Sequence, residues 1–162
     1  MPEASLAADQ ERAGVIAAVD AFATSWRDSG DLLGTEHRAV TDRTATDRWV
    51  LRFRGAEKDV IAIWLTLGQR TVLAEAEVMP APDEAAAQVH ELVLTRNAGL
   101  FGLGYAIGQE RGIYLMARVP AASVDAEELD RLCGAIVSEI DEVYPTVMTL
   151  AFPRHYRRRR RG

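Results

Sequence analysis

Apolar residues recur at helical spacing in two long segments of the chain. In residues 9–28 they stand three or four positions apart, which gathers them on one face of a helix. The members of this stripe are Val15, Val19, Phe22 and Trp26. In residues 125–144 a similar stripe is formed by Leu129, Leu132, Cys133, Ile136, Val137, Ile140 and Tyr144. Two long amphipathic helices are therefore expected, one near each end of the chain.

Polar residues and prolines predict where helices begin and end. Asp125 and Glu128 have the spacing of a capping box, and Pro145 is expected to end or kink the last helix. A shorter helix is expected to begin after Asp83 as its N-cap and to end at residues 97–99. One face of this shorter helix carries Val89, Leu92, Val93 and Arg96.

Between these helices, large apolar side chains recur at every second position, which is typical of strands. The runs are residues 48–54, 59–67, 71–78, 101–107 and 113–119. The second run is apolar on both faces, which predicts a central strand, and the short turns beside it indicate an antiparallel meander. Residues 31–48 are polar and β-branched, and they are expected to form a loop or an irregular edge.

The element order is therefore α-β-β-β-α-β-β-α. It predicts an α+β domain whose five-stranded antiparallel sheet has helices mainly on one face. Residues 1–8 are expected to be a flexible lead, residues 9–152 the single domain, and residues 153–162 a disordered arginine-rich tail.

The glycine-rich stretch 97–120 has two interpretations, a phosphate-binding loop or a hairpin. The third glycine, Gly108, comes one position late for a G-x-G-x-x-G fingerprint. The stretch also has no lysine, and a strand pattern follows where a helix would be needed. A hairpin that turns at residues 109–112 is favoured. Its small face, with Gly102, Gly104 and Gly108, is expected to let another backbone or helix approach closely.

Composition favours a single domain in a reducing compartment. The chain has 162 residues and one cysteine, Cys133, so it has no internal disulfide. No basic segment followed by an apolar core stands at the N-terminus, so a signal peptide is not expected. The prediction is a cytoplasmic protein.

The charge is distributed unevenly. The chain has 19 basic and 24 acidic residues, and six of the arginines lie in residues 154–162. Nucleic-acid binding through the acidic folded surface is therefore disfavoured. The tail remains a candidate for weak electrostatic contact with nucleic acid or an anionic membrane. Its consecutive arginines are Arg157, Arg158, Arg159, Arg160 and Arg161.

No motif in the sequence predicts catalysis. His37, His90 and His155 lack a second ligand at metal spacing, and no nucleophile elbow is present. Glu75 and Glu77 project from one strand face, but a solvated sheet face is the favoured interpretation, with Arg48, Arg52 or Arg54 as cross-strand partners. The expectation is a protein that is not an enzyme and that has no cofactor and no catalytic or metal-binding residues.

Two segments carry a resemblance to a known family. They are "LVLTRNAGLFGLGYAIGQERGIYLMARVP", followed by the acidic helix start "VDAEELDRLCGAIVSEID". With the preceding meander, they resemble the YbjN family, whose fold is similar to that of type III secretion chaperones. The resemblance covers roughly residues 10–152 and leaves out the arginine tail. It implies a regulatory or chaperone-like bacterial protein, dimeric in the manner of secretion chaperones, and names no chemistry.

A candidate partner-binding surface lies on the sheet. Large aromatic residues dominate interface energetics, and Trp64 stands on the strand face opposite the one assigned to the helices, whereas Trp49 and Tyr105 are expected in the core. The expected surface consists of Val60, Ala62, Trp64, Val72 and Ala74. It predicts a homodimer or a contact with another protein. The rival hypothesis is a nucleic-acid-associated regulator that acts through the arginine tail.

Overall fold

The computed structural model describes residues 2–40 and 45–158 of the chain. The helices are α1 (Pro2–Ser29), α2 (Ala86–Asn97) and α3 (Ala126–Ala151). The strands are β1 (Leu32–Ala39), β2 (Asp47–Arg54), β3 (Val60–Leu67), β4 (Thr71–Met79), β5 (Gly104–Ile107) and β6 (Ile113–Pro120). Short 3₁₀ turns cover Gln109–Arg111 and Ala121–Ser123.

The strands form one antiparallel sheet in the order β1-β2-β3-β4-β6-β5. The predicted α+β class and antiparallel meander are confirmed, but the sheet has six strands rather than five. The additional strand is β1, in the segment expected to be a loop or an irregular edge. It pairs with β2 along one side only, and most of its residues are exposed. An edge strand of this kind needs no apolar alternation, so the sequence pattern did not reveal it.

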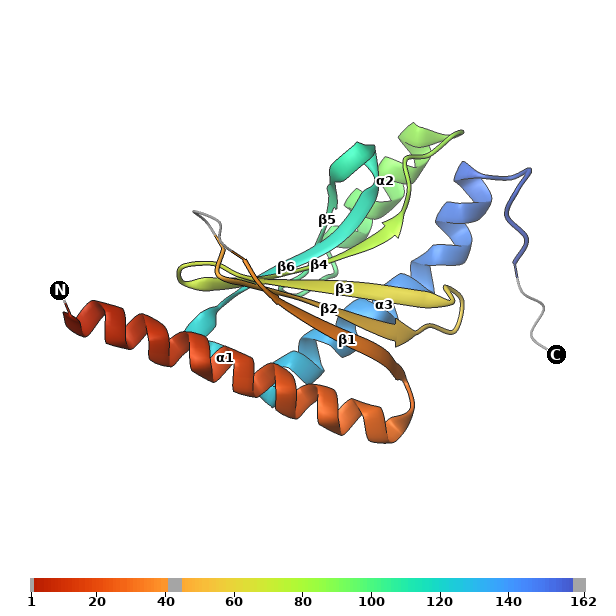
Figure 1. The fold of residues 1–162 in the computed structure, drawn as a ribbon. Coiled ribbons are helices and arrows are strands. Elements are labelled where there is room, and N and C mark those ends of the chain that lie inside the picture. The colour runs from red at the N-terminus through yellow and green to blue at the C-terminus, as the bar shows by residue number, and fades with distance from the viewer. Residues whose placement is uncertain (1, 41–44, 159–162) are drawn as a thin grey trace.

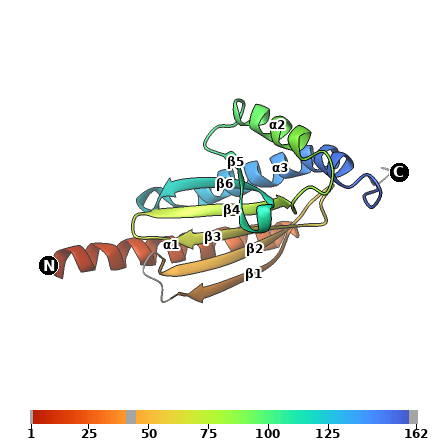
Figure 2. The ribbon, with the colours of Figure 1, turned by 90° about the horizontal axis from the view of Figure 1, so that it is seen from above.

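Helices α1 and α3 cover one face of the sheet (Figure 1), and Figure 2 shows the other face with these two helices behind it. Alternate residues of the central strands point toward the helices and are fully buried, among them Leu51, Ile63 and Leu65. Trp49 and Tyr105 are buried, as expected. Trp26 is partly buried, and its Nε1 donates to Asp130 Oδ1 at 2.7 Å, which links α1 to α3.

Helix α1 is longer than the apolar pattern indicates. It begins at Pro2, so residues 2–8, expected to be a flexible lead, are helical in the structure. Proline is well tolerated at the first helical position, and Glu3 suits the positive first turn. Residues 3–10 are exposed, so this part of the helix buries no apolar stripe from which it could have been recognised.

The predicted helix ends are partly correct. Asp125 caps α3 and accepts the Glu128 N–H at 2.7 Å. Pro145 does not end the helix, which continues to Ala151 with Pro145 and Val147 buried in its packed face. Helix α2 begins after Ala85, whose φ is 53°, and Asp83 is not its N-cap. The burial of Val89 and Val93 positions α2 instead.

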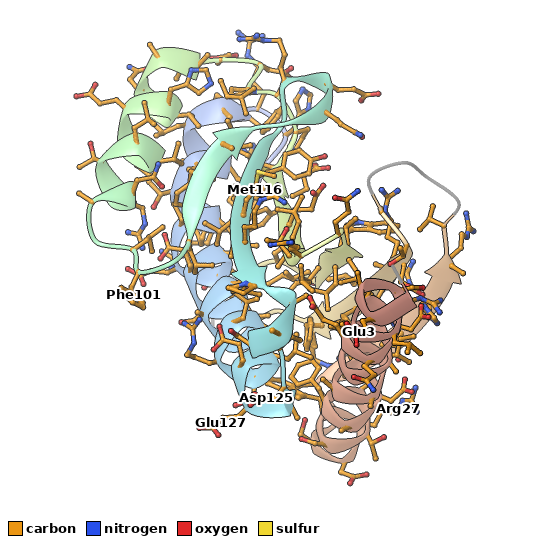
Figure 3. All side chains as sticks on the ribbon, turned by 90° about the vertical axis from the view of Figure 1, so that its left-hand side faces the viewer. Glu3, Arg27, Phe101, Met116, Asp125 and Glu127 are labelled. Carbon is orange, nitrogen blue, oxygen red and sulfur yellow. The ribbon has the colours of Figure 1, made fainter. Side chains whose placement is uncertain are left out.

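The β5–β6 hairpin is confirmed, with its turn at Gln109–Arg111. Strand β5 is shorter than the alternation predicts, because it begins at Gly104. Phe101 therefore lies in the preceding loop and is 89% exposed, and Figure 3 shows it at the outer edge of the molecule.

Candidate interface on the open face of the sheet

The face of the sheet that α1 and α3 leave uncovered is called here the open face. Antiparallel partners project from the same face, so the register assigns its members. Trp64 on β3 stands opposite Val50 on β2 and Glu75 on β4. Glu36 and Met116 extend this row onto β1 and β6. The row through Trp64 thus crosses most of the sheet.

Trp64 is the most prominent apolar residue of the open face. Its exposed fraction is 42%, the same as that of Val60 on the same strand, and Ala62 between them is partly exposed. Val50 is 2% exposed although it belongs to this face. These positions agree with the prediction that Val60, Ala62 and Trp64 share an open strand face.

The two other members of the expected surface lie elsewhere. Val72 pairs with Leu67 and Ala74 pairs with Leu65, so both face the helices, and both are fully buried. The prediction that they accompany Trp64 is wrong. The residues of β4 that project from the open face are Thr71, Leu73, Glu75 and Glu77.

Acidic and basic groups of the open face pair differently from the prediction. Arg52 Nη1 lies 2.9 Å from Glu36 Oε1, across β1 and β2. Glu77 lies opposite Tyr114 rather than an arginine, with 3.5 Å between Tyr114 Oη and Glu77 Oε2. Burial, followed by the charges of Glu77 and Glu75, raises the pKa of Tyr114. Tyr114 is thus a neutral hydrogen-bond donor on this face.

Two hollows flank Trp64 on the open face. The larger, of about 550 Å³, is lined by Ala45, Arg48, Trp64, Thr66, Gly68, Leu73, Glu75, Gln109, Tyr114 and Arg118. The smaller, of about 500 Å³, is lined by Glu36, His37, Arg38, Val40, Arg48, Val50 and Trp64. Trp64 and Arg48 are common to both, so the indole forms a ridge between two polar depressions.

None of the three predicted glycines has a backbone or helix packed closely against it, and a close neighbour, which is a side chain, is present only at Gly108. A Cβ at Gly108 would collide with the Tyr114 ring. A Cβ at Gly104 would lie 3.9 Å from Asn97 Oδ1, and one at Gly102 would have no neighbour within 4 Å. Gly102 lies outside the strand, and its φ of +69° explains the glycine through backbone conformation rather than packing.

A polar cluster that the sequence did not predict joins α1, β1 and β2 on the helix-covered side. Asp47 is fully buried and accepts from Arg12 Nε at 2.6 Å and Arg12 Nη2 at 2.9 Å. His37 Nε2 lies 2.8 Å from Asp47 Oδ1, and its ring stacks on Trp49. Burial would raise the pKa of Asp47, but the hydrogen bonds from Arg12 and His37 hold it below its ordinary value. The cluster closes the edge of the core.

The described residues give no geometry for metal binding or thiol chemistry. Within residues 2–40 and 45–158, no three His, Cys, Asp or Glu side chains gather as metal ligands. Cys133 is fully buried, and burial raises the pKa of its thiol, so it packs as a small apolar residue.

The described part of the arginine tail lies near the end of α3. Arg157 Nη1 donates to the Pro153 carbonyl at 3.1 Å, and Arg158 Nη2 lies 3.6 Å from Glu57 Oε1. The Tyr156 ring contacts Tyr144 edge to face. The other predicted contact residues, Arg159, Arg160 and Arg161, lie outside the described residues.

The family assignment follows from comparison with known proteins. Residues 27–148 match the family model of YbjN, described as "Putative bacterial sensory transduction regulator". The chain belongs to the YbjN family. The match covers every strand, α2 and most of α3, so the open face lies wholly inside the YbjN domain.

The relatives of this YbjN protein include mycobacterial sequences. An uncharacterized protein of Mycobacterium tuberculosis, Rv0487, is 31% identical over 64% of this chain and 56% of its own length. An uncharacterized protein of Mycobacterium leprae is 35% identical over 54% of this chain and 48% of its own length. The chain thus spans about half the length of the curated relatives it matches.

A solved structure shares the fold of this YbjN protein. It is a chain of the heterodimeric complex ExoU-SpcU from the type III secretion system of Pseudomonas aeruginosa. The TM-score is 0.50 with 18% identity, over 72% of this chain and 90% of that chain. At this identity the likeness concerns the fold alone. Among the described residues, no helix is long and apolar enough to span a membrane.

Proposed function

We propose that this YbjN protein is a non-catalytic binding module that holds another protein on the open face of its sheet. The observation that carries the proposal is Trp64, a large aromatic side chain exposed at the middle of an uncovered sheet face. It shares its strand face with the exposed Val60 and lies between two hollows. Aromatic residues that become buried at the centre of an interface contribute most of its binding energy.

Two further observations support a binding role. The fold is similar to that of a chain from the heterodimeric complex ExoU-SpcU, and the YbjN family is described as a "Putative bacterial sensory transduction regulator". The buried carboxylates of Asp47 and Glu139 accept hydrogen bonds from Arg12 and Arg96. This is the arrangement of structural ion pairs rather than of an open acid-base site.

Site-specific photo-crosslinking would test this proposal. A photoreactive residue at position 62, on the open face, should give a discrete protein adduct in cell extract that survives nuclease treatment. The same group at position 142, on the solvent side of α3, is the matched control, since Glu142 is 68% exposed. Trp64→Arg should abolish the adduct at position 62 without unfolding the protein, because its side chain is half-exposed.

Sedimentation of the purified chain would distinguish self-association from binding of a different protein. A dimer that Trp64→Arg converts to a monomer would make the partner a second copy of the chain. Equal adducts at positions 62 and 142, unchanged by Trp64→Arg, would refute the proposed function.

A further inference from the structure

A row of three arginines crosses the open face beside the row that contains Trp64. Arg38 on β1 stands directly opposite Arg48 on β2, and Arg48 stands opposite Thr66. The row continues through Leu73 to Arg118 on β6. Like charges placed directly opposite each other destabilise a sheet, so the folded chain gains no stability from this arrangement by itself.

These arginines have no carboxylate partner within the described chain. None of the three has an ion pair among residues 2–40 and 45–158, and the side chain of Arg118 donates to the Thr71 hydroxyl at 3.3 Å. Elsewhere in the fold the arginines Arg12, Arg96 and Arg131 each hold a carboxylate with two hydrogen bonds. Among the described residues, the row is therefore a set of exposed guanidinium groups without a carboxylate partner.

The unpaired arginines line the hollows beside Trp64. Arg48 lines both, Arg118 lines the larger one, and Arg38 lines the smaller one. Both hollows are thus lined by at least one of these guanidinium groups and by the indole of Trp64. Arginine binds carboxylates through two parallel hydrogen bonds, which gives directional specificity as well as attraction.

We propose that the open face recognises an acidic protein segment. In this arrangement, carboxylates of the segment pair with Arg38, Arg48 and Arg118, and its apolar side chains cover Trp64. The inference rests on the proposed function and names the chemistry of its partner.

The other charges of the face favour spaced carboxylates over a continuous phosphate backbone. Glu36, Glu75 and Glu77 project from the same face, and Glu75 lines the larger hollow. A polyphosphate chain that crossed the face would pass these carboxylates and be repelled. A peptide places its charges only where its sequence has acids, and it can offer amide donors to Glu75.

Fluorescence anisotropy with labelled synthetic peptides provides the test. The probe is a short peptide in which Glu alternates with Leu, the matched control is the same peptide with Gln in place of Glu, and a single-stranded oligonucleotide is the polyanion control. The full chain should bind the Glu peptide at least about tenfold more tightly than the Gln peptide, and the difference should shrink as salt is added.

Arginine variants locate the binding. Arg48→Gln and Arg118→Gln should each weaken binding of the Glu peptide about fivefold, and Arg48→Lys should weaken it less, because the charge is retained. Arg154→Gln is the matched control, since Arg154 is 84% exposed beyond the end of α3. It makes the same change in net charge and should leave binding unaltered.

Each contrary outcome overturns acid recognition in a recognisable way. Equal binding of the Glu and Gln peptides, lost in Trp64→Ala but not in the arginine variants, would overturn it and leave the protein-binding role standing. Tighter binding of the oligonucleotide, lost in the same arginine variants, would replace it with a polyanion site. Failure of both peptides to bind would also overturn it, and the crosslinking at position 62 would then decide the proposed function independently.

Discussion

Arg96 of α2 and Glu139 of α3 form a two-pronged ion pair, with Nε–Oε1 at 2.6 Å and Nη2–Oε2 at 2.9 Å. Tyr105 of β5 donates its hydroxyl to the same carboxylate. The side chain of Glu139 is 9% exposed, and that of Arg96 is 30% exposed. One carboxylate therefore ties together two helices and the edge strand.

Glu139→Gln should destabilise the fold. It removes the charge that compensates Arg96 and leaves an amide that cannot accept all three hydrogen bonds, so the free energy of unfolding should fall by about 2–3 kcal/mol. The effect is below that of a fully enclosed pair because Arg96 is partly solvated. Denaturant unfolding measures it.

Glu142→Gln is the matched control for this change. Glu142 lies 3.2 Å from Arg96 Nη2, but its side chain is 68% exposed. Its replacement should alter the unfolding free energy by about 0.5 kcal/mol or less. Equal losses of unfolding free energy in Glu139→Gln and Glu142→Gln would show that the contribution of Glu139 to stability does not depend on its burial.

Acid should destabilise the protein through Glu139 and Asp47. Burial opposes ionisation of both carboxyls, but hydrogen bonds from Arg96 and Tyr105, and from Arg12 and His37, hold their folded-state pKa below the ordinary values of 4.5 and 3.8. As the pH falls below these values, the unfolded state takes up protons before the folded state does. This contribution to stability is complete above the ordinary pKa and is lost as the pH falls through the folded pKa.

Unfolding free energies measured at a series of pH values test this sign. The wild-type protein should lose stability steadily as the pH is lowered below about 4.5. Glu139→Gln should be less stable at neutral pH but should show a shallower loss in acid. An acid slope of Glu139→Gln as steep as that of the wild type would contradict the assignment to Glu139.

The glycines of the hairpin should differ in their tolerance of a methyl group. Gly108→Ala places its Cβ against the Tyr114 ring, and such overpacking typically destabilises by about 1–3 kcal/mol. Gly104→Ala meets no atom closer than 3.9 Å, so its effect should stay within about 0.5 kcal/mol in either direction. Thermal unfolding of the two variants, compared side by side, checks the contrast. A larger loss of stability in Gly104→Ala than in Gly108→Ala would contradict the packing described for this face.

The sequence pattern predicts more of the fold than of the site. Alternation in residues 71–78 correctly divides β4 into two faces, but both faces carry apolar residues, Val72 and Ala74 on one and Leu73 on the other. Which face joins Trp64 depends on the register between β3 and β4, where Trp64 pairs with Glu75. Alternation within one strand has no information on that pairing, so Val72 and Ala74 were assigned to the wrong side.

The polar clusters were missed for a related reason. Asp47 and Arg12 are 35 residues apart, and Glu139 and Arg96 are 43 apart. Periodicity and capping motifs relate residues within about one or two helical turns, so these pairs become visible only once the elements are packed. The arginine row of the open face is hidden in the same way, since Arg38, Arg48 and Arg118 are placed in one row only by the strand order.

Asp141 of α3 holds the turn between β2 and β3. Its Oδ2 accepts the Ala56 N–H at 2.8 Å, and its Oδ1 accepts those of Glu57 and Lys58 at 2.9 and 3.2 Å. The turn is tight, because a Cβ at Gly55 would collide with the Lys58 carbonyl. One carboxylate thus satisfies three successive backbone donors.

Asp141→Ala should weaken the attachment of this turn to α3. It leaves three N–H groups without their acceptor, two of them partly buried, and a lost partner of a buried donor typically destabilises by about 1–3 kcal/mol. The stability of Asp141→Asn should fall between those of the wild type and Asp141→Ala. Its amide oxygen can still accept from Glu57 and Lys58, while its NH₂ faces the Ala56 donor. Hydrogen exchange at residues 56–58 should accelerate in the order wild type, Asn, Ala. Unchanged protection from hydrogen exchange in Asp141→Ala would mean that the strands alone hold the turn. Helix α3 would then contribute to the core but not to the turn that joins β2 and β3.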